Sequence, residues 1–226
     1  RLCQRCVSDR RWWHDGGPLG SMAAIRLVIF DMDDVLCRYD FARRLACLAE
    51  VTSLPADYID DVIFRSGFDE LGDRGRYTAE AYLQQFSDHL GVAVSRKDWL
   101  WARWQSITPD GAMLALVERL RTQVPVAMLT NNGPLLREGL SEVFPQLVDL
   151  FGARAFFSCQ LGCSKEEPAI FHAVLDIMGG QAETTLFIDD SETYIASARS
   201  AGLRTHHFAG IGALANALRA FDLSPD

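Results

Sequence analysis

The stretch VIFDMDDVLCRYD (residues 28–40) places three acids directly after a continuously apolar run. The run ends at Phe30, and a strand that is apolar on both faces is typical of a parallel sheet covered by helices on both sides. Asp31, Asp33 and Asp34 then crowd like charges together at the carboxyl end of that strand. The stretch therefore predicts a buried strand of a parallel sheet, with a cation needed at its end.

The rest of the chain repeats the pattern of a short apolar run followed by a segment with helical periodicity. The predicted strands cover residues 25–30, 124–130, 155–158, 184–188 and 203–208. The predicted helices cover residues 111–121, 134–143, 168–178, 191–201 and 212–220. Strands that alternate with helices in this way predict an α/β fold, with a parallel sheet between two layers of helices.

The segment between the first two predicted strands is much longer than the roughly dozen residues that a crossover needs. Within it, Tyr82, Phe86 and Leu90 recur at helical spacing after Thr78, a residue type that caps helix N-termini. The segment shows no convincing strand, so we expect a small inserted α-helical cap domain over the carboxyl edge of the sheet. The expected division is a core domain of residues 24–37 and 109–226 and a cap domain of residues 38–108.

Residues 1–23 differ in character from residues 24–226, because arginines, tryptophans and a Gly-Gly-Pro turn precede any periodic pattern. GPLGSM (17–22) is similar to the scar that a tag-removal protease leaves, although sixteen residues precede it. We interpret residues 1–23 as an N-terminal extension or a remnant of expression cloning. Cys3 and Cys6 have the spacing of half a zinc site, but no second pair stands nearby, and we expect no structural metal there.

Composition narrows the class of partner. The chain of 226 residues has a formal net charge of −8, and 49% of its residues are hydrophobic, as in folded globular proteins. Nucleic acids and anionic membranes attract clustered Lys and Arg, so the charge argues against both as main partners. No apolar run reaches the roughly 18 residues of a membrane span, and no leader peptide is recognisable. We therefore expect a cytoplasmic protein, and the sequence leaves its oligomeric state open. A small anionic substrate is compatible with this net charge where cations gather locally.

In open α/β sheets, ligands bind outside the carboxyl ends of the strands. The polar residues predicted at or near those ends are Asp31, Asp33, Thr130, Asn131, Lys165, Asp189 and Asp190. Carboxylates gathered at one edge repel each other unless a hard cation joins them, and proteins hold Mg²⁺ through carboxylates, water and substrate phosphate. The pattern predicts a Mg²⁺ site, with Lys165 offsetting part of the negative charge.

Over about residues 24–210 the chain resembles the haloacid dehalogenase (HAD) superfamily of phosphohydrolases. The matching motifs are Asp31-x-Asp33, Thr130, Lys165 and Asp189-Asp190, in that order. The resemblance implies a Rossmann-like, HAD-like core with the type of cap that is inserted after the first motif. GFDELGDRGRYTAEAYLQQF (67–86) and LTNNGP (129–134) are similar to segments of sugar-phosphate phosphatases and of the phosphatase domain of soluble epoxide hydrolases.

The resemblance also implies a role for each motif residue. Asp31 is expected to attack phosphorus as the nucleophile, and Asp33 to act as general acid and then general base. Thr130 and the backbone at Asn131 would hold the phosphoryl oxygens, while Lys165 would neutralise charge on the nucleophile and the phosphate. The expected Mg²⁺ ligands are Asp31, the carbonyl of Asp33, and the acids Asp189 and Asp190, either of which is a candidate for direct coordination.

The implied activity is Mg²⁺-dependent hydrolysis of a small phosphorylated metabolite, such as a sugar phosphate, through an aspartyl-phosphate intermediate. A phosphomutase, a haloacid dehalogenase and a non-catalytic HAD-like binding protein are the alternatives. Asp33 disfavours the dehalogenase, because halide release needs no leaving-group acid and the dehalogenase branch carries a non-acid there. Two departures from the family pattern are Asp34, where a glycine or small polar residue is usual, and Glu166-Glu167-Pro168 in place of Pro-Asp-Pro.

Overall fold

The buried strand β1 (Leu27–Phe30) lies at the centre of a five-stranded parallel sheet in the computed structural model, which describes residues 24–225. The strand order is β5-β4-β1-β6-β7, and Ile29 pairs with Ala127 on one side and Phe187 on the other. The other strands are β4 (Val126–Thr130), β5 (Ala155–Phe157), β6 (Thr185–Asp189) and β7 (Arg204–His207). The predicted α/β fold with a parallel sheet is confirmed, and each predicted strand agrees with the observed one within two residues.

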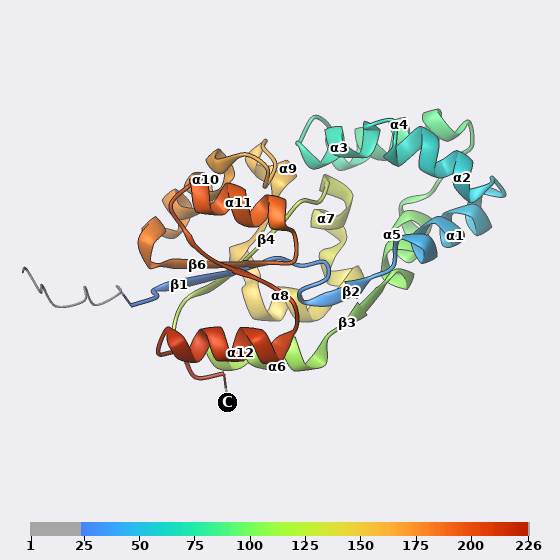
Figure 1. The fold of residues 1–226 in the computed structure, drawn as a ribbon. Helices are drawn as coiled ribbons and strands as arrows, with labels where there is room; N and C mark the ends of the chain where they lie inside the picture. The colour runs from blue at the N-terminus through green and yellow to red at the C-terminus, as the bar shows by residue number, and fades with distance from the viewer. Residues whose placement is uncertain (1–23, 226) are drawn as a thin grey trace, which may run out of the picture.

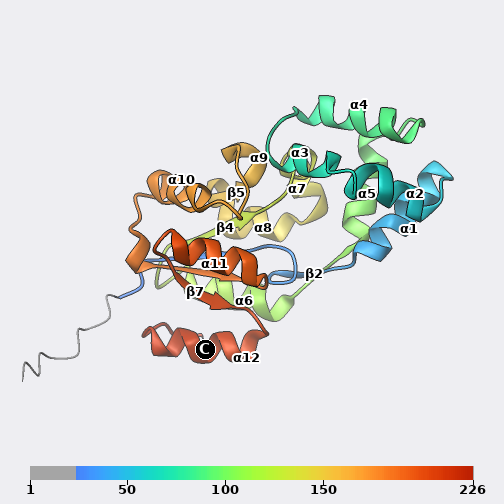
Figure 2. The ribbon, with the colours of Figure 1, turned by 45° about the horizontal axis from the view of Figure 1, so that its top comes forward.

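Helices cover both faces of this sheet (Figures 1 and 2). Successive side chains of β1 point to opposite faces, so Leu27 and Ile29 join one apolar cluster while Val28 and Phe30 join the other. The helices α10 (Pro168–Met178) and α11 (Glu192–Ser200) cover the first face, and α6 (Gly111–Leu120), α8 (Pro145–Phe151) and α12 (Ile211–Ala220) cover the second. Burial on both faces explains why β1 reads as an unbroken apolar run.

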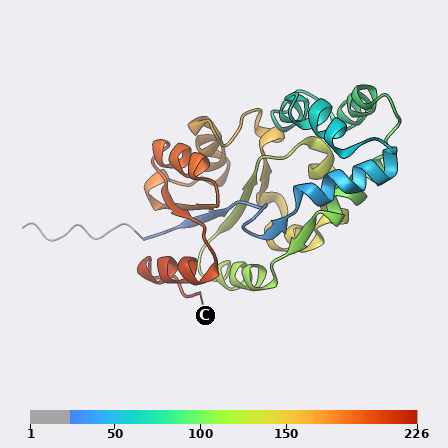
Figure 3. The same cartoon turned by 45° about the vertical axis from the view of Figure 1, so that its right-hand side comes forward.

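A helical segment lies beyond the carboxyl ends of the strands (Figure 3). It comprises α1 (Phe41–Thr52), α2 (Ala56–Ile59), the π-helical η1 (Asp60–Phe64), α3 (Phe68–Asp73), α4 (Ala79–Leu90) and α5 (Arg96–Gln105). The Thr78 hydroxyl accepts a hydrogen bond from the amide of Ala81 at the start of α4, as its residue type predicts. Between this segment and α8 lies α7 (Pro134–Val143), and Leu100 of α5 packs where Gly139 of α7 lacks a side chain.

The chain enters and leaves the helical segment through a short antiparallel ribbon. Its strands are β2 (Cys37–Tyr39) and β3 (Ile107–Pro109), with Arg38 opposite Thr108. The prediction that residues 38–108 contain no strand is therefore wrong. Strands of three residues show no recognisable alternation, and their pairing joins positions far apart in the sequence.

The remaining short elements are η2 (Gly152–Arg154), α9 (Ser158–Leu161) and η3 (Ala182–Thr184). No helix in residues 24–225 combines the length and apolar character needed to cross a bilayer. The expectations for residues 1–23, including those for Cys3 and Cys6, lie outside the described residues.

Candidate active site

Three residues from separate parts of the chain meet at the carboxyl edge of the sheet. Asp31 follows β1, Asp189 ends β6, and Lys165 lies in the loop before α10. The Nζ atom of Lys165 lies 2.6 Å from Oδ1 of Asp31 and 2.7 Å from Oδ2 of Asp189. All three residues are buried. The fold thus brings together the lysine and two of the acids that the sequence singled out.

The electrostatics of this cluster disfavour the ionised form of Asp31. Burial raises the pKa of Asp31 to about 8; Lys165 opposes the rise and Asp189 adds to it. Burial acts to lower the pKa of Lys165, but the carboxylates of Asp31 and Asp189 raise it above its ordinary value. Lys165 is therefore a permanent cation shared by two acids, and a further cation is needed to keep Asp31 ionised.

A third acid completes a set of oxygen donors. Carboxylate oxygens of Asp31, Asp189 and Asp190 lie within 4.8 Å of one another. Asp189 is fully buried, and its Oδ1 accepts a hydrogen bond from the amide of Ser191, whereas Asp190 is exposed. Three convergent carboxylates that open to solvent on one side fit Mg²⁺, a hard cation that takes carboxylate ligands and keeps several waters.

The loop after β4 frames the other side of the cluster. Thr130 is buried, and its hydroxyl accepts a hydrogen bond of 2.7 Å from Nδ2 of Asn132. The side chain of Asn131 donates to the Ser164 hydroxyl and accepts from the backbone amide of Lys165, both at 3.0 Å. Asn131 thereby fixes the loop that carries the catalytic lysine candidate, a positioning role that the sequence did not reveal.

Asp33 points away from the carboxylate cluster and toward the helical segment. Its two carboxylate oxygens lie 2.7 and 2.6 Å from Nη2 of Arg103 on α5, and Asn132 adds a bond of 3.2 Å. Burial acts to raise the pKa of Asp33, but Arg103, Asn132 and Lys165 together outweigh it and the pKa is lowered on balance. Arg103 is 1% exposed and stacks over the Tyr39 ring at 4.3 Å. Sequence reasoning missed Arg103, whose only signal is its place among the tryptophans of WLWARWQ (99–105).

The two departures from the family pattern have structural explanations. Asp34 adopts the left-handed conformation (φ 59°), which favours glycine and tolerates aspartate, and its carboxylate accepts the amide of Tyr39 at 3.0 Å. It therefore stabilises the turn between β1 and β2. Arg74, which follows α3, forms an ion pair with Glu167, with 2.5 Å between Nη1 and Oε1. Nη2 of the same guanidinium lies 3.7 Å from Oε2 of Glu166. These acids tie the helical segment to the loop of Lys165.

A cavity of about 210 Å³ lies between Asp33 and the helical segment. The core side contributes Asp33, Asn131 and Asn132, and the other side contributes aromatic and charged residues of α1, η1, α3 and α5. Its lining residues are Asp33, Tyr39, Phe41, Arg44, Phe64, Asp69, Asp73, Arg103, Asn131 and Asn132. The position suits the part of a substrate that lies beyond the reacting group.

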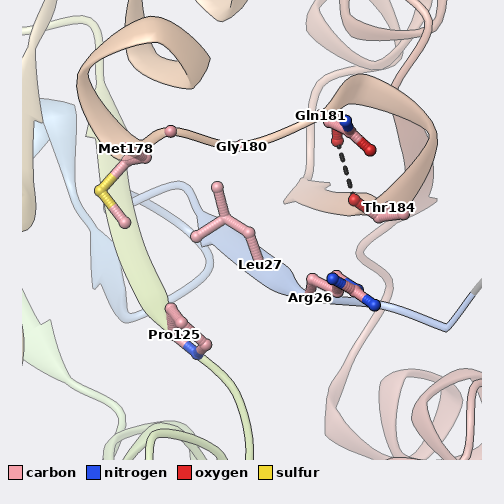
Figure 4. Close-up of a pocket in the computed structure, with 8 residues that line it drawn as sticks. Arg26, Leu27, Pro125, Met178, Gly180, Gln181 and Thr184 are labelled. Carbon is pink, nitrogen blue, oxygen red and sulfur yellow. Dashed lines mark hydrogen bonds between the residues drawn. The ribbon is translucent and has the colours of Figure 1, made fainter.

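A second hollow, of about 310 Å³, lies at the opposite edge of the sheet (Figure 4). Arg26 and Leu27 at the start of β1, Pro125 before β4 and the Gln181–Thr184 turn before β6 line it. The hydroxyl of Thr184 donates to the Gln181 carbonyl at 3.2 Å, so it is already satisfied. None of the clustered acids lines this second hollow, so it is separate from the candidate active site.

A family model and a known relative both match most of this chain. The family model described as haloacid dehalogenase-like hydrolase matches residues 25–202. The chain is 25% identical over 195 residues to Phosphatase MT3486 of Mycobacterium tuberculosis, a match that covers 81% of this chain and 87% of the relative.

Solved structures share the fold. A HAD family enzyme from Bacteroides thetaiotaomicron, crystallised with magnesium and inorganic phosphate, superposes with a TM-score of 0.72 at 24% identity, over 83% of this chain and 96% of that one. A HAD-like hydrolase from Porphyromonas gingivalis gives 0.75 at 24% identity, over 87% and 99%. An L-2-haloacid dehalogenase from Xanthobacter autotrophicus gives 0.59 at 18% identity, over 87% and 83%.

Proposed function

Because the chain belongs to the haloacid dehalogenase-like hydrolase family, we propose that it is a Mg²⁺-dependent phosphatase that hydrolyses a small phosphorylated metabolite through an aspartyl phosphate. The observation that carries this proposal is the ion pair of Lys165 with Asp31 and Asp189, beside the exposed carboxylate of Asp190. The similarity of the chain to Phosphatase MT3486 supports the same chemistry. So does the likeness of its fold to that of an enzyme crystallised with magnesium and inorganic phosphate.

The proposed reaction has two displacements. In the first, a carboxylate oxygen of Asp31 attacks phosphorus, and the ester oxygen departs with a proton from Asp33. In the second, Asp33 takes a proton from a water molecule, which attacks the phosphorus of the aspartyl phosphate and releases inorganic phosphate. The Arg103 ion pair favours the carboxylate form of Asp33, which is the form that accepts this proton. The proton taken from water regenerates the protonated form, which is the acid of the first displacement in the next turnover.

The other residues of the site bind and orient the phosphoryl group. Lys165 offsets charge on the nucleophile, and Thr130 with the backbone at Asn131 holds phosphoryl oxygens. A Mg²⁺ ion held by Asp31, the Asp33 carbonyl and the acids Asp189 and Asp190 would supply Lewis-acid stabilisation of the phosphoryl charge. Because Lys165 and Ser191 already engage both oxygens of Asp189, Asp190 is the freer direct ligand.

The two expected parts of the chain have different roles in the proposed function. We interpret residues 24–37 and 109–226 as the catalytic core and residues 38–108 as a cap that excludes water and contacts the leaving group. Two contacts between the parts support this: the pair of Arg103 with Asp33, and that of Arg74 with Glu167. The β2–β3 ribbon provides the connection.

Metal dependence tests the proposal directly. We expect the protein to release phosphate from an aryl phosphate when Mg²⁺ is present, and chelation by EDTA to lower the rate by at least about 100-fold, because several kcal/mol of charge stabilisation are lost. Readdition of Mg²⁺ should restore the rate. A rate that is the same with Mg²⁺ and with EDTA contradicts the proposal.

The role of Asp33 predicts a dependence on the leaving group. We expect Asp33→Asn to slow hydrolysis of an alkyl phosphate by about 100- to 10,000-fold, since an alkoxide needs a proton to depart. The first displacement on an aryl phosphate should slow much less, because a phenolate leaves without help. The measurement is the single-turnover rate of leaving-group release, phenolate from the aryl ester and alcohol from the alkyl ester, and equal slowing for both esters argues against Asp33 as the acid.

The haloacid dehalogenase alternative has weaker support. Its structural neighbours share the fold only, at 18% identity for the example from Xanthobacter. Carbon–halogen cleavage needs no general acid, so it gives no role to Asp33 or to its ion pair with Arg103. Halide release from a 2-haloacid without added metal would favour this alternative over the phosphatase.

A further inference from the structure

Arg44 is a buried cation that forms no ion pair with the described residues. It lies on α1 and is 6% exposed. Its Nη1 donates to the hydroxyl of Tyr39 at 3.2 Å, and its guanidinium lies 5.0 Å from the ring centroids of both Phe64 and Trp99. Among residues 24–225, no carboxylate lies within 4.0 Å of this guanidinium. Arginine is almost never buried in this way without a partner, because removing its charge from water is costly.

The guanidinium borders the cavity beside Asp33. Two other charged groups of the cavity wall, Arg103 and Asp69, have partners within the protein. Arg103 is paired with Asp33, and Asp69 accepts a hydrogen bond from the Tyr82 hydroxyl. Burial and the nearby Asp69 raise the pKa of Asp73 well above its ordinary value, which favours the neutral form of that carboxyl. Burial acts to lower the pKa of Arg44, but Tyr39 and the nearby Asp69 raise it. No carboxylate of the described residues contacts the guanidinium of Arg44, so it is available to interact with whatever fills the cavity.

The cavity has the size of a small leaving group. Its volume of about 210 Å³ equals that of about seven water molecules at roughly 30 Å³ each. This suits a leaving group of a few carbon atoms. A single guanidinium carries one positive charge and presents paired N–H donors that match the two oxygens of a carboxylate. A second phosphate would bring up to two negative charges close to Asp33 and Asp69, with one free cation to meet them.

We propose that Arg44 binds a carboxylate on the leaving group, so that the substrate is the phosphate ester of a small hydroxy acid. This inference rests on the proposed phosphatase function and specifies its substrate class. The phosphoryl group lies at Asp31, the ester oxygen faces Asp33, and the carboxylate reaches Arg44 across the cavity. Hydroxyl groups on the same leaving group have Asp73 and Asn132 as polar neighbours.

A matched pair of esters tests the assignment. 3-Phosphoglycerate and glycerol 3-phosphate share a three-carbon skeleton and differ in a carboxylate against a neutral hydroxymethyl group. We expect the parent protein to prefer 3-phosphoglycerate, and Arg44→Gln to reduce that preference, measured as the ratio of the two kcat/KM values, by about 10- to 100-fold. The loss should appear mainly in KM, because the carboxylate contact exists before the reaction begins. Arg44→Lys should restore part of the preference.

Arg65→Gln is the matched control. Arg65 lies just after η1 in the same helical segment, is exposed, and pairs with Asp60 and Asp61 instead of facing the cavity. Its substitution should leave both kcat/KM values unchanged. Equal turnover of the two esters by the parent, or an equal loss for both esters in Arg44→Gln, overturns the inference while leaving the phosphatase proposal intact.

A binding measurement tests the carboxylate contact of Arg44 independently of the proposed phosphatase activity. If the parent hydrolyses no aryl phosphate, the phosphatase proposal fails, and calorimetry with glycerate and glycerol then tests Arg44 independently. We expect glycerate to bind the parent more tightly than glycerol does, and the difference to shrink in Arg44→Lys and Arg44→Gln. Equal binding of glycerate and glycerol by the parent overturns the assignment, including in the case that Arg44→Gln does not fold.

Discussion

Replacement of Asp31 by asparagine is expected to lower phosphate release by at least about 10,000-fold, because an amide is a very poor nucleophile toward phosphorus. The substitution is nearly isosteric. It keeps a hydrogen-bond acceptor facing Lys165, which still pairs with Asp189 at 2.7 Å. The loss should therefore appear in kcat with an aryl phosphate and Mg²⁺, while circular dichroism shows an unchanged fold.

The control for this substitution is Asp176→Asn. Asp176 is an exposed residue of α10 and lies outside the candidate active site. The same chemical change there should leave the rate within about twofold, as is usual for surface positions. A folded Asp31→Asn protein that retains the parent rate would exclude Asp31 as the nucleophile.

Replacement of Lys165 by methionine is expected to affect both stability and activity. The lysine is 1% exposed and contacts two buried carboxylates, so its loss leaves them without their cation. Breaking a buried ion pair typically costs about 3–5 kcal/mol in the free energy of unfolding, and for a chain of this size the melting temperature should fall by roughly 10 °C. We also expect phosphate release to fall by about 100- to 1,000-fold, by analogy with the removal of one group that stabilises transition-state charge.

Lys97→Met provides the comparison for Lys165→Met. Lys97 is an exposed residue of α5, and its substitution should change neither the melting temperature nor the rate appreciably. Mg²⁺ should raise the melting temperature of Lys165→Met more than that of the parent, because a cation at the acids compensates for the missing lysine. A Lys165→Met protein with the stability and rate of the parent would show that the ion pairs at this edge are dispensable.

Much of the core fold followed from sequence, because burial on both faces leaves a clear pattern. The runs around Phe30 and Phe187 are apolar throughout, as a central parallel strand requires, and the segments 134–143 and 168–178 match α7 and α10 in the structure. Both of these helices begin with proline, which fixes their start in sequence as well as in space. The short strands β2 and β3 carry no such signal, because three residues cannot establish a period.

The carboxylate cluster was also predictable in outline. In a parallel sheet the carboxyl ends of the strands share one edge, so Asp31 and Asp189 had to lie near each other once the topology was known. Their common contact with Lys165 is the detail that the structure adds. The structure also explains Asp34, whose carboxylate satisfies a turn amide.

The residues contributed by the helical segment were not predictable. Arg44 and Arg103 lie on helices whose other buried residues are apolar or aromatic, and nothing in local spacing distinguishes a buried arginine from an exposed one. Their importance depends on where the helical segment sits relative to Asp33, which is a tertiary property. The same holds for Asn132, whose bonds to Thr130 and Asp33 depend on the shape of one loop.

The aspartyl phosphate on Asp31 is the central claim, and it can be trapped. In Asp33→Asn the base for the second displacement is absent, so an aryl phosphate should phosphorylate the protein faster than water removes the group. Acid quenching followed by peptide mass spectrometry should find one phosphate, labile to base, on Asp31, and none when Asp31→Asn is added to the same protein. Phosphate release without any modified protein, or a phosphate on a different residue, would contradict the account.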